Sequence, residues 1–298
     1  MRPTSLAAIA VLFWLPLGMA QDVPLERLPS NHPGLVVDLG VGLWAWPLPM
    51  DYDRDGDLAL LVSCPDIPYN GTYFVENPGD GKLPVFRPAV RLGEALSNAS
   101  ISYADGQNFV LTPGEVVSTD AARFGTATRI HDGTVHKTEG RIRANQWKYA
   151  DYDADGVLDL VVGIGDWTDY GWDNAYNAQG EWTNGPLHGW VYFLRNSGTT
   201  AAPQYDTPVK IMAGDAPVDV YGMPSPNFAD FDGDGDLDLL CGEFVDGFTY
   251  FENVGTRSAP KYAAGRPLAR DGAPMLMDLC MIVVVAIDWT ADGHPDLV

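Results

Sequence analysis

The sequence predicts an all-β protein, a β-propeller whose blades each contain four short strands. One observation is an acidic ten-residue pattern that occurs four times, as DYDRDGDLAL, DYDADGVLDL, DFDGDGDLDL and DWTADGHPDL, beginning at Asp51, Asp151, Asp230 and Asp288. A second is that apolar, β-branched and aromatic runs of strand length follow the first three copies. A third is that the sequence shows no sustained helical periodicity. We therefore expect about four visible blades, in a propeller that is incomplete at its C-terminus.

The strands are expected in the same order in each repeat. Around the first copy they are Leu35–Leu39, Leu43–Leu48, Leu58–Ser63, Thr72–Glu76 and Pro84–Arg91. The later repeats give Leu158–Val162, Trp190–Leu194, Leu237–Cys241 and Phe248–Glu252. An aromatic residue followed by x-x-N-x-G ends each unit, at Asn77, Asn196 and Asn253. Strands of this length, separated by turn residues, are typical of propeller blades.

The N-terminus has the three-part pattern of a secretory signal peptide. Residues 1–20 contain Arg2, an apolar run from Leu6 to Leu17, and small residues before Gln21. Residues 21–34 are polar and contain proline, so we expect a lead-in segment followed by the propeller at 35–298. The mature chain is expected to be secreted, either extracellular or periplasmic.

Charge and composition exclude several classes of partner. The net charge is −22, with 40 acidic and 18 basic residues, which argues against nucleic acid and anionic membranes. Beyond the leader, the sequence lacks an apolar run long enough to span a bilayer, so we expect no membrane insertion of the mature chain. Cys64, Cys241 and Cys280 are expected to be buried small hydrophobes, and a Cys64–Cys241 bridge is not expected.

The acidic copies have the spacing of calcium loops. Calcium takes six to eight oxygen ligands, and carboxylates at positions 1, 3, 5 and 9 with a backbone carbonyl at position 7 can surround one ion. Glycine at position 6 permits the sharp turn. We expect two strong Ca²⁺ sites and two weaker ones, because Ala59 replaces a carboxylate in the first copy and Thr290 replaces one in the fourth. The expected metal-site residues are Asp51, Asp53, Asp55, Asp57, Asp151, Asp153, Asp155, Val157, Asp159, Asp230, Asp232, Asp234, Asp236, Asp238, Asp288, Thr290, Asp292, His294 and Asp296.

Two other interpretations of these copies are less favoured. An EF-hand needs an acidic ligand at position 12 between helices, but Val62, Val162 and Cys241 occupy that position and strands are expected on both sides. Simple Asp/Gly turns are common, yet chance does not explain four copies with one spacing.

The pattern D-x-D-x-D-G-x-x-D-L, with the later aromatic-x-x-N-x-G phrase, resembles the FG-GAP/VCBS repeats of integrin α-subunit propellers and of secreted bacterial proteins. The resemblance covers most of residues 35–298. It implies a propeller, commonly seven-bladed, with calcium in the loop between the first and second strands of a blade.

Two long segments interrupt the repeats, at about 93–145 and 166–189. The first contains an expected hairpin, Ile101–Leu111, turning at Asp105-Gly106. Strand topology places both segments at the end of the blades opposite the acidic loops, and insertions of this kind commonly carry function.

The second segment is the candidate ligand-binding region. Its aromatic rings can contact the C–H faces of sugars or a protein surface, or they can fold back as a small local core. Acids just beyond the second strand of three blades could bind a ligand or serve in acid/base chemistry, or could simply be solvated loop acids. The candidate ligand residues are Asp66, Asp166, Trp167, Tyr170, Trp172, Tyr176, Trp182 and Glu243.

We find no catalytic motif in the sequence. His131, His136 and His188 lack zinc-ligand spacing, and a G-x-S-x-G nucleophile motif is absent. The sequence therefore favours a non-enzymatic, calcium-stabilised propeller that binds extracellular glycan or protein. The alternatives are a polysaccharide-degrading, lyase-like enzyme, since similar propellers occur among rhamnogalacturonan lyases, and a structural module of a larger surface protein.

Overall fold

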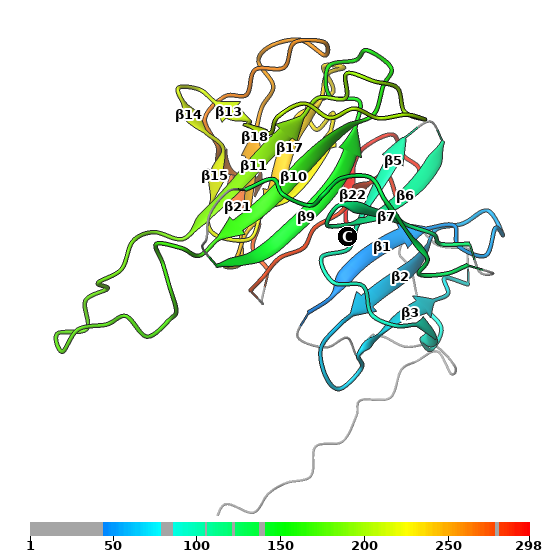
Figure 1. The fold of residues 1–298 in the computed structure, drawn as a ribbon, viewed down its shortest axis with the longest axis horizontal. Helices are drawn as coiled ribbons and strands as arrows, with labels where there is room; N and C mark the ends of the chain where they lie inside the picture. Colours follow the sequence, from blue (N-terminus) through cyan, green and yellow to red (C-terminus); the bar gives the residue numbers. More distant parts are fainter. Residues whose placement is uncertain (1–43, 79–85, 105, 121–122, 137–140, 278–279) are drawn as a thin grey trace, which may run out of the picture. The chain divides into compact units, whose positions relative to one another are not determined.

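Antiparallel strands form the framework of the chain, and the described residues contain no α-helix (Figure 1). The computed structural model describes residues 44–298 except 79–85, 105, 121–122, 137–140 and 278–279, all within the unit Gly34–Val298. The expected signal peptide at 1–20, the lead-in at 21–34 and the strand at Leu35–Leu39 lie outside these residues. Among the described residues, none belongs to a helix able to cross a membrane.

Four antiparallel sheets form the blades of a β-propeller, which confirms the predicted fold class. In each blade the main strands pair in chain order, so the chain runs outward from an inner strand to an outer one. Blade 1 contains β1 (Trp46–Met50), β2 (Ala59–Cys64), β3 (Gly71–Val75) and β4 (Val90–Gly93). Blade 2 contains β5 (Ser100–Ala104), β6 (Gln107–Thr112), β7 (Glu115–Val117) and β8 (Ala127–Arg129).

Blades 3 and 4 repeat this plan. Blade 3 contains β9 (Ile142–Ala150), β10 (Asp159–Asp166), β11 (His188–Leu194) and β12 (Val209–Lys210), and β15 (Asp219–Val220) also pairs with β11. Blade 4 contains β16 (Ser225–Ala229), β17 (Asp238–Gly242), β18 (Phe248–Phe251) and β19 (Arg266–Pro267). Three two-stranded sheets accompany the blades: β13 (Met212–Ala213) with β14 (Ala216–Pro217), β20 (Ala269–Arg270) with β21 (Ala273–Pro274), and β22 (Ala286–Ile287) with β23 (Asp296–Leu297).

Blade 2 corrects the sequence interpretation of residues 93–145. This segment is not an insertion between blades, because it contains the complete four-stranded sheet β5–β8. The expected hairpin is confirmed, with Ile101 opposite Val110, although Asp105 lies outside the described residues. Blade 2 escaped detection as a repeat because a short turn joins β5 to β6 where the other blades have an acidic loop. The fourth acidic loop instead joins β22 to β23.

Apolar side chains fill the spaces between successive blades. Trp46 and Leu61 of blade 1 pack with Ile101 of blade 2, and Val161 of blade 3 packs with Leu239 of blade 4. These side chains are almost fully buried. Each such side chain contributes about 1.5–3 kcal/mol through burial, so contacts between blades are a main source of stability.

The hairpin β22–β23 contacts both blade 4 and blade 1. Val284 packs with Leu240 of blade 4, whereas the next residue, Val285, packs with Trp46 of blade 1. Val298 lies against the blade 1 cluster that includes Val62. The C-terminal segment thus joins blade 4 to blade 1.

Cysteine burial matches the sequence prediction at two positions and contradicts it at the third. Cys64 and Cys241 are buried in β2 and β17, whereas Cys280 is exposed. Cys280 lies at a bend after β21, outside the strands, so it does not have the place in a sheet that buries Cys64 and Cys241.

The candidate metal loops and the opposite end of blade 3

The four acidic loops share one unusual backbone conformation. In every loop the residues at positions 4 and 6 have positive φ, a region that most L-residues avoid. An added Cβ at the position 6 glycines would meet no atom within 4 Å, so glycine is required there for its conformation and not for space. The φ angles are 64° at Arg54, 101° at Gly56, 57° at Ala154, 81° at Gly156, 83° at Gly233, 94° at Gly235, 53° at Ala291 and 89° at Gly293.

The carboxylate at position 5 stabilises this conformation in all four copies. It accepts a hydrogen bond from the backbone N–H at position 7, closing a turn of the kind that Asp side chains favour. The N···O distances are 3.2 Å for Asp57 to Asp55, 2.9 Å for Val157 to Asp155, 3.0 Å for Asp236 to Asp234 and 3.0 Å for His294 to Asp292. Four different neighbourhoods therefore hold the same local geometry.

Three of the loops bring carboxylate oxygens together. In each group one oxygen from every member lies within 4.8 Å of the others: Asp51, Asp53 and Asp55; Asp151, Asp153 and Asp155; and Asp230, Asp232 and Asp238. Among the described residues, the fourth loop yields no such group. Its Thr290 Oγ1 is buried without a hydrogen-bond partner, where the other loops have an aspartate.

The acidic loops also contain buried oxygens that lack a partner in the protein. These atoms are Asp51 Oδ1, Asp57 Oδ1, Asp151 Oδ1, Asp153 Oδ1 and Asp236 Oδ1. A buried carboxylate oxygen with no donor is costly, and hard oxygen ligands are those that calcium prefers. The residues present therefore fit a divalent cation in the first three loops.

The position 9 carboxylates have a second role that the sequence did not reveal. Asp238 is buried and accepts hydrogen bonds from the N–H of Phe231 (3.2 Å), the hydroxyl of Tyr250 (2.8 Å) and the N–H of Asn253 (2.7 Å). Asp159 does the same with the N–H groups of Tyr152 and Asn196. These bonds link each acidic loop to the asparagine of the aromatic-x-x-N-x-G phrase, so the two motifs form one unit.

Blade 1 keeps part of this link without a position 9 carboxylate. The side-chain amide of Asn77 donates to the carbonyl oxygen of Leu58 (2.9 Å), and Asn196 makes the equivalent bond to Leu158 (3.1 Å). Ala59 therefore removes the carboxylate link of the loop but not its connection to the third strand.

Crowding of like charges is visible in the pKa values of the loops. Burial, followed by repulsion from Asp153 and Asp155, raises the pKa of Asp159 to about 6. Burial and neighbouring carboxylates also raise the pKa of Asp236. In both residues burial is the larger cause and repulsion between carboxylates is the smaller one.

Blade 3 differs from the other blades because guanidinium groups approach its loop. Arg195 lies 3.1 Å from Asp153 and 3.1 Å from Asp155. Arg257, from blade 4, donates to the backbone oxygen of Asp151 at 2.6 Å. The residue that precedes the motif asparagine is Arg195 here but glutamate in the equivalent phrases of blades 1 and 4, a sequence signal that was available and was missed.

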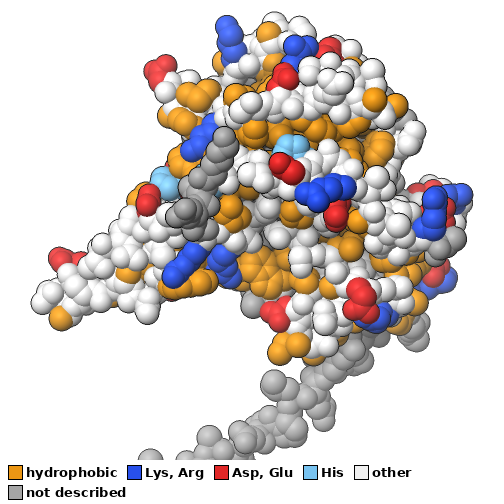
Figure 2. Space-filling model, in the orientation of Figure 1, with side chains coloured by type: hydrophobic (Ala, Val, Ile, Leu, Met, Phe, Trp, Pro, Cys, Tyr) orange, Lys and Arg blue, Asp and Glu red, His pale blue; other side chains and the backbone are white. Residues whose placement is uncertain are grey.

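Within the predicted segment 166–189, Asp166 ends β10 and residues 188–189 begin β11, so residues 167–187 form the connection, at the end of blade 3 opposite the acidic loop. Figure 1 shows this β10–β11 loop projecting away from the sheets, and Figure 2 shows few charged side chains along it. Lys and Arg side chains gather near its base (Figure 2), where the guanidinium of Arg141 lies 4.9 Å from the ring centre of Trp172.

The aromatic residues of the β10–β11 loop divide into two groups. Trp167 is fully buried, with its ring 5.0 Å from Phe244 and the Arg143 guanidinium 4.5 Å above it. This residue matches the local-core interpretation. By contrast, Tyr176 is 61% exposed and Trp172 is 49% exposed.

Tyr170 and Trp182 stack on each other with ring centres 4.4 Å apart, and Tyr176 meets Trp182 edge-on at 5.2 Å. The three rings, together with Asn184 and Tyr221, line an open cavity of about 270 Å³. Three of the predicted ligand residues, Tyr170, Tyr176 and Trp182, therefore line an accessible cavity, whereas Trp167 and Trp172 do not.

The three candidate acids are not joined in the structure. Among the described residues, no hydrogen bond or ion pair connects Asp66, Asp166 and Glu243. Asp66 accepts from the N–H of Ile67, and Glu243 accepts from the hydroxyl of Thr249. They provide no shared acidic centre.

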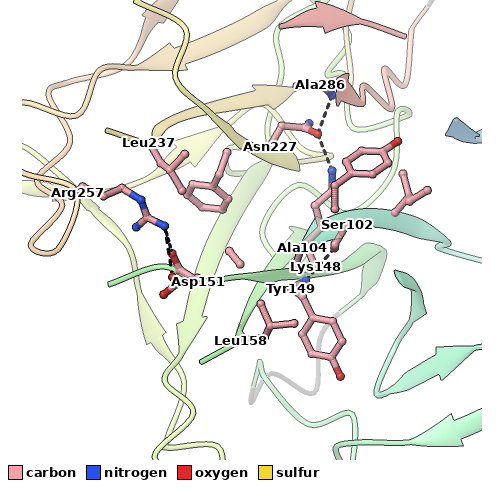
Figure 3. A pocket seen from close by; sticks show the side chains of 14 residues that line it. Ser102, Ala104, Lys148, Tyr149, Asp151, Leu158, Asn227, Leu237, Arg257 and Ala286 are labelled. Carbon is pink, nitrogen blue, oxygen red and sulfur yellow. Dashed lines mark hydrogen bonds and ion pairs between the residues drawn. The ribbon is translucent and has the colours of Figure 1, made fainter. Parts of the chain in front are cut away.

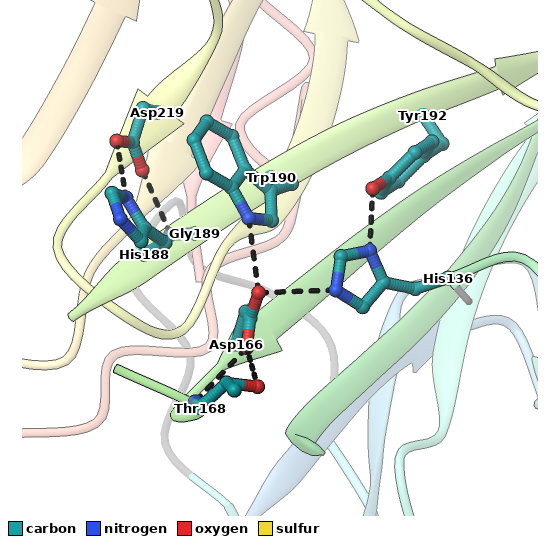
Figure 4. Close-up of polar contacts among 8 residues, drawn as sticks. All are labelled: His136, Asp166, Thr168, His188, Gly189, Trp190, Tyr192 and Asp219. Atoms are coloured by element: carbon teal, nitrogen blue, oxygen red, sulfur yellow. Dashed lines mark hydrogen bonds and ion pairs between the residues drawn. The ribbon is translucent and has the colours of Figure 1, made fainter. Parts of the chain in front are cut away.

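Asp166 instead anchors a buried polar cluster (Figure 4). It accepts from Thr168 Oγ1 (2.6 Å) and from the indole N–H of Trp190 (3.3 Å), and lies 3.0 Å from His136 Nε2. The other ring nitrogen of His136 lies 2.5 Å from the hydroxyl of Tyr192. Burial opposes ionisation of Asp166, but the hydrogen bonds from Thr168, together with the nearby His136 and Trp190, outweigh this effect and lower the pKa of Asp166.

Sequence reasoning named Asp166 but missed this cluster, because His136 and Tyr192 come from distant parts of the chain. The neighbouring His188 pairs with Asp219 at 2.7 Å. Among the described residues, none of the side-chain groups that could hold a metal ion contains a histidine.

A scan against models of protein families found no match, and a search of curated proteins found no similar sequence.

Proposed function

We propose that this chain is a calcium-stabilised β-propeller of the FG-GAP/VCBS type, exported through a signal peptide at residues 1–20. Calcium is held by the acidic loops and fixes one end of the blades. The aromatic end of the β10–β11 loop binds an extracellular glycan. The proposal joins three features that lie in different parts of the fold.

The observation that carries the calcium proposal is the set of buried carboxylate oxygens without a partner. They occur in loops whose backbone conformation is repeated in all four copies. A bound Ca²⁺ supplies the positive charge that these oxygens lack. The chain's own residues orient the carboxylates. The position 5 carboxylate closes a turn by accepting a hydrogen bond, and the hydrogen bonds of the position 9 carboxylate link the loop to the motif asparagine.

The loops are expected to differ in affinity. The blade 4 loop, with Asp230, Asp232 and Asp238 close together, has no arginine ion pair among the described residues and should bind most tightly. In the blade 3 loop, calcium must compete with Arg195 for the carboxylate of Asp153. The loops beginning at Asp51 and Asp288 each lack one carboxylate and should bind more weakly.

Isothermal titration of the metal-free protein with CaCl₂ tests the proposal directly. We expect saturable heat from more than one site, and a loss of the tightest site in Asp232→Asn. Titration with MgCl₂ is the control, because Mg²⁺ prefers a rigid octahedral site. Absence of calcium binding to folded protein would sink the metal proposal.

The ligand proposal depends on the accessible rings of the β10–β11 loop. Stacked and edge-on rings beside an amide can bind sugars, since the ring faces contact C–H groups and the amide binds hydroxyls. Tyr170, Tyr176 and Trp182 provide the rings and Asn184 provides the amide. The net charge of −22 favours neutral or basic ligands over acidic ones.

Affinity electrophoresis in gels containing neutral polysaccharides tests this assignment. We expect at least one polysaccharide to retard the wild type, and Tyr176→Ala or Trp182→Ala to abolish the retardation. Tyr69→Ala is a matched control, because Tyr69 is an exposed tyrosine (40%) on the β2–β3 loop of blade 1. Retardation that survives both loop variants would contradict the assignment, and binding of a surface protein instead would favour the protein-contact alternative.

One observation favours the lyase-like alternative, the chain of contacts from Asp166 through His136 to the Tyr192 hydroxyl. A carboxylate can hold an imidazole in one tautomer for proton abstraction. Wild-type protein should then form an unsaturated product that absorbs ultraviolet light, and His136→Gln should form none. Lack of product from every polysaccharide retained in the gels would count against catalysis.

A further inference from the structure

A cavity of about 260 Å³ lies among the inner strands of blades 2, 3 and 4. Figure 3 shows the side chain of Lys148, from β9, reaching toward Asn227 of β16 within this cavity. Asp151 and Arg257 also line it. The functions proposed above for the acidic loops and the aromatic cavity give no role to this second cavity or to Lys148.

Polar side chains on the inner strands of blades 2 and 4 bond to the backbone of the following strand segment. Ser102 Oγ accepts from the N–H of Tyr149 (2.9 Å). Asn227 Nδ2 donates to the carbonyl oxygen of Val284 (2.9 Å). These bonds satisfy the buried polar groups between blade 2 and blade 3, and between blade 4 and the segment before β22.

The inner strand of blade 3 departs from this pattern. Lys148 and Asn227 each lie three residues before the first aspartate of their acidic loop, and Ser102 lies on the inner strand of blade 2. Lys148 Nζ bonds the side chain of Asn227 (2.5 Å) and not the backbone of β16. Two residues earlier, the side-chain oxygen of Gln146 is buried without a partner. Lys148 therefore contacts blade 4 through a side chain and not through the backbone of its inner strand.

Lys148 is a buried amine without a counter-charge. Its residue is 6% exposed, and none of the ion pairs among the described residues includes it. Its hydrogen-bond partner, Asn227 Oδ1, also accepts from the N–H of Ala286 (3.1 Å). Burial lowers the pKa of Lys148 to about 7, and the nearby Cys241 thiol from β17 stays neutral because burial raises its pKa.

The environment of the amine favours a neutral electrophile. A cationic ligand would meet the guanidinium of Arg257, and an anionic ligand would meet the carboxylate of Asp151, both of which line the cavity. A neutral amine that donates one N–H to Asn227 keeps a lone pair for nucleophilic attack, which is how buried lysines form Schiff bases. The cavity has room for a molecule of a few non-hydrogen atoms.

We propose that this cavity binds a small neutral aldehyde or ketone, which the amine of Lys148 captures as an imine. The amine nitrogen attacks the carbonyl carbon, and two protons from the amine leave with the carbonyl oxygen as water. The carbon–oxygen double bond is replaced by a carbon–nitrogen double bond, with no oxidant or reductant consumed. Asn227 orients the amine as a positioning residue.

Reductive labelling of the calcium-loaded, full-length protein tests the proposal. The protein is treated with glycolaldehyde and cyanoborohydride at pH 7, and labelled peptides are quantified by mass spectrometry. Lys261 is exposed and is the internal control. We expect Lys148 to be labelled at least about tenfold faster than Lys261, because an ordinary lysine is almost fully protonated at this pH.

Two variants sharpen the result. Asn227→Asp places a carboxylate beside the amine and should slow labelling of Lys148 at least about tenfold while leaving Lys261 unchanged. Lys148→Met should remove the label at this position alone. Labelling of Lys148 no faster than Lys261 in the wild type would overturn the proposal, and this measurement does not depend on whether either variant folds.

Discussion

Single residues near each acidic loop determine how much of its negative charge a bound cation would neutralise. In blade 3 the guanidinium of Arg195 lies where an added cation would also be attracted, 3.1 Å from two carboxylates. In blades 1 and 4 a glutamate precedes the motif asparagine. The four loops thus share a backbone conformation but not an electrostatic environment.

Arg195→Ala is expected to strengthen calcium binding at the blade 3 loop by about two- to fivefold. The ion pairs of Arg195 are exposed and screened by solvent, so they compete only weakly with a bound cation, and this is the competition that the substitution removes. Calorimetric titration measures the change. Arg87→Ala, which breaks the exposed ion pair with Glu76, is the control and should leave the blade 3 site unchanged; weaker binding in Arg195→Ala would contradict the competition.

Asp238→Ala is expected to destabilise the fold by about 2–4 kcal/mol, even in chelator. Its three hydrogen bonds brace the loop against β18 and the following turn, and loss of a buried acceptor leaves donors unpaired. Urea denaturation in EDTA measures the free energy of unfolding. Asp232→Asn is the comparison and should reduce stability mainly when calcium is present; equal losses in EDTA would refute the distinct role of position 9.

The raised pKa of Asp159 predicts a pH dependence in the metal-free protein. Its folded pKa of about 6 exceeds the ordinary value of 3.8, so the folded state binds more protons between these values and stability falls as pH rises through that window. In EDTA, the wild type should lose stability relative to Asp159→Asn between about pH 4 and pH 6. A stability difference that is constant across this range would contradict the raised pKa.

At the scale of elements, the β10–β11 loop combines an anchor with an accessible surface. Trp167 belongs to the fold, because Phe244 and Arg143 cover its ring. Tyr176 and Trp182 belong to the cavity. Substitution of Trp167 should therefore reduce stability, whereas substitution of Tyr176 or Trp182 should reduce ligand binding with little effect on stability.

Trp167→Ala is expected to cost about 3–5 kcal/mol of stability, the usual range for a buried tryptophan. Tyr176→Ala should change stability by less than about 0.5 kcal/mol, since surface substitutions rarely do more. Chemical denaturation of both variants in calcium measures the contrast. If the two losses are similar, the division of the loop into anchor and surface is wrong.

The sequence predicted the elements that carry strong local patterns. The acidic loops, the strands on either side of them and the hairpin Ile101–Leu111 follow from Asp, Gly and β-branched residues that act over a few positions. Blade 2 was missed because its first turn is short and carries no repeat signature. The Asp166–His136–Tyr192 cluster and the Lys148 cavity were missed because they unite residues from different blades, which local patterns do not specify.

At the scale of the whole molecule, calcium is expected to determine thermal stability. A ligand that binds only the folded state adds RT ln(1 + [L]/Kd) per site, about 2.7 kcal/mol at one hundred times Kd. EDTA should therefore lower the Tm by several degrees, and excess CaCl₂ should restore it. Scanning calorimetry measures the shift, with MgCl₂ as the control; an unchanged Tm in EDTA would contradict metal binding by the native loops.

Val285 and Trp46 belong to one buried hydrophobic cluster, which joins segments that are far apart in the chain. In an open array of repeats, each unit depends only on its neighbours and can unfold from an end. Here the hairpin β22–β23 also packs against blade 1, so separating the two would expose apolar surface. This long-range contact favours slow folding, since distant segments must meet first, and it couples the blades into one cooperative unfolding unit.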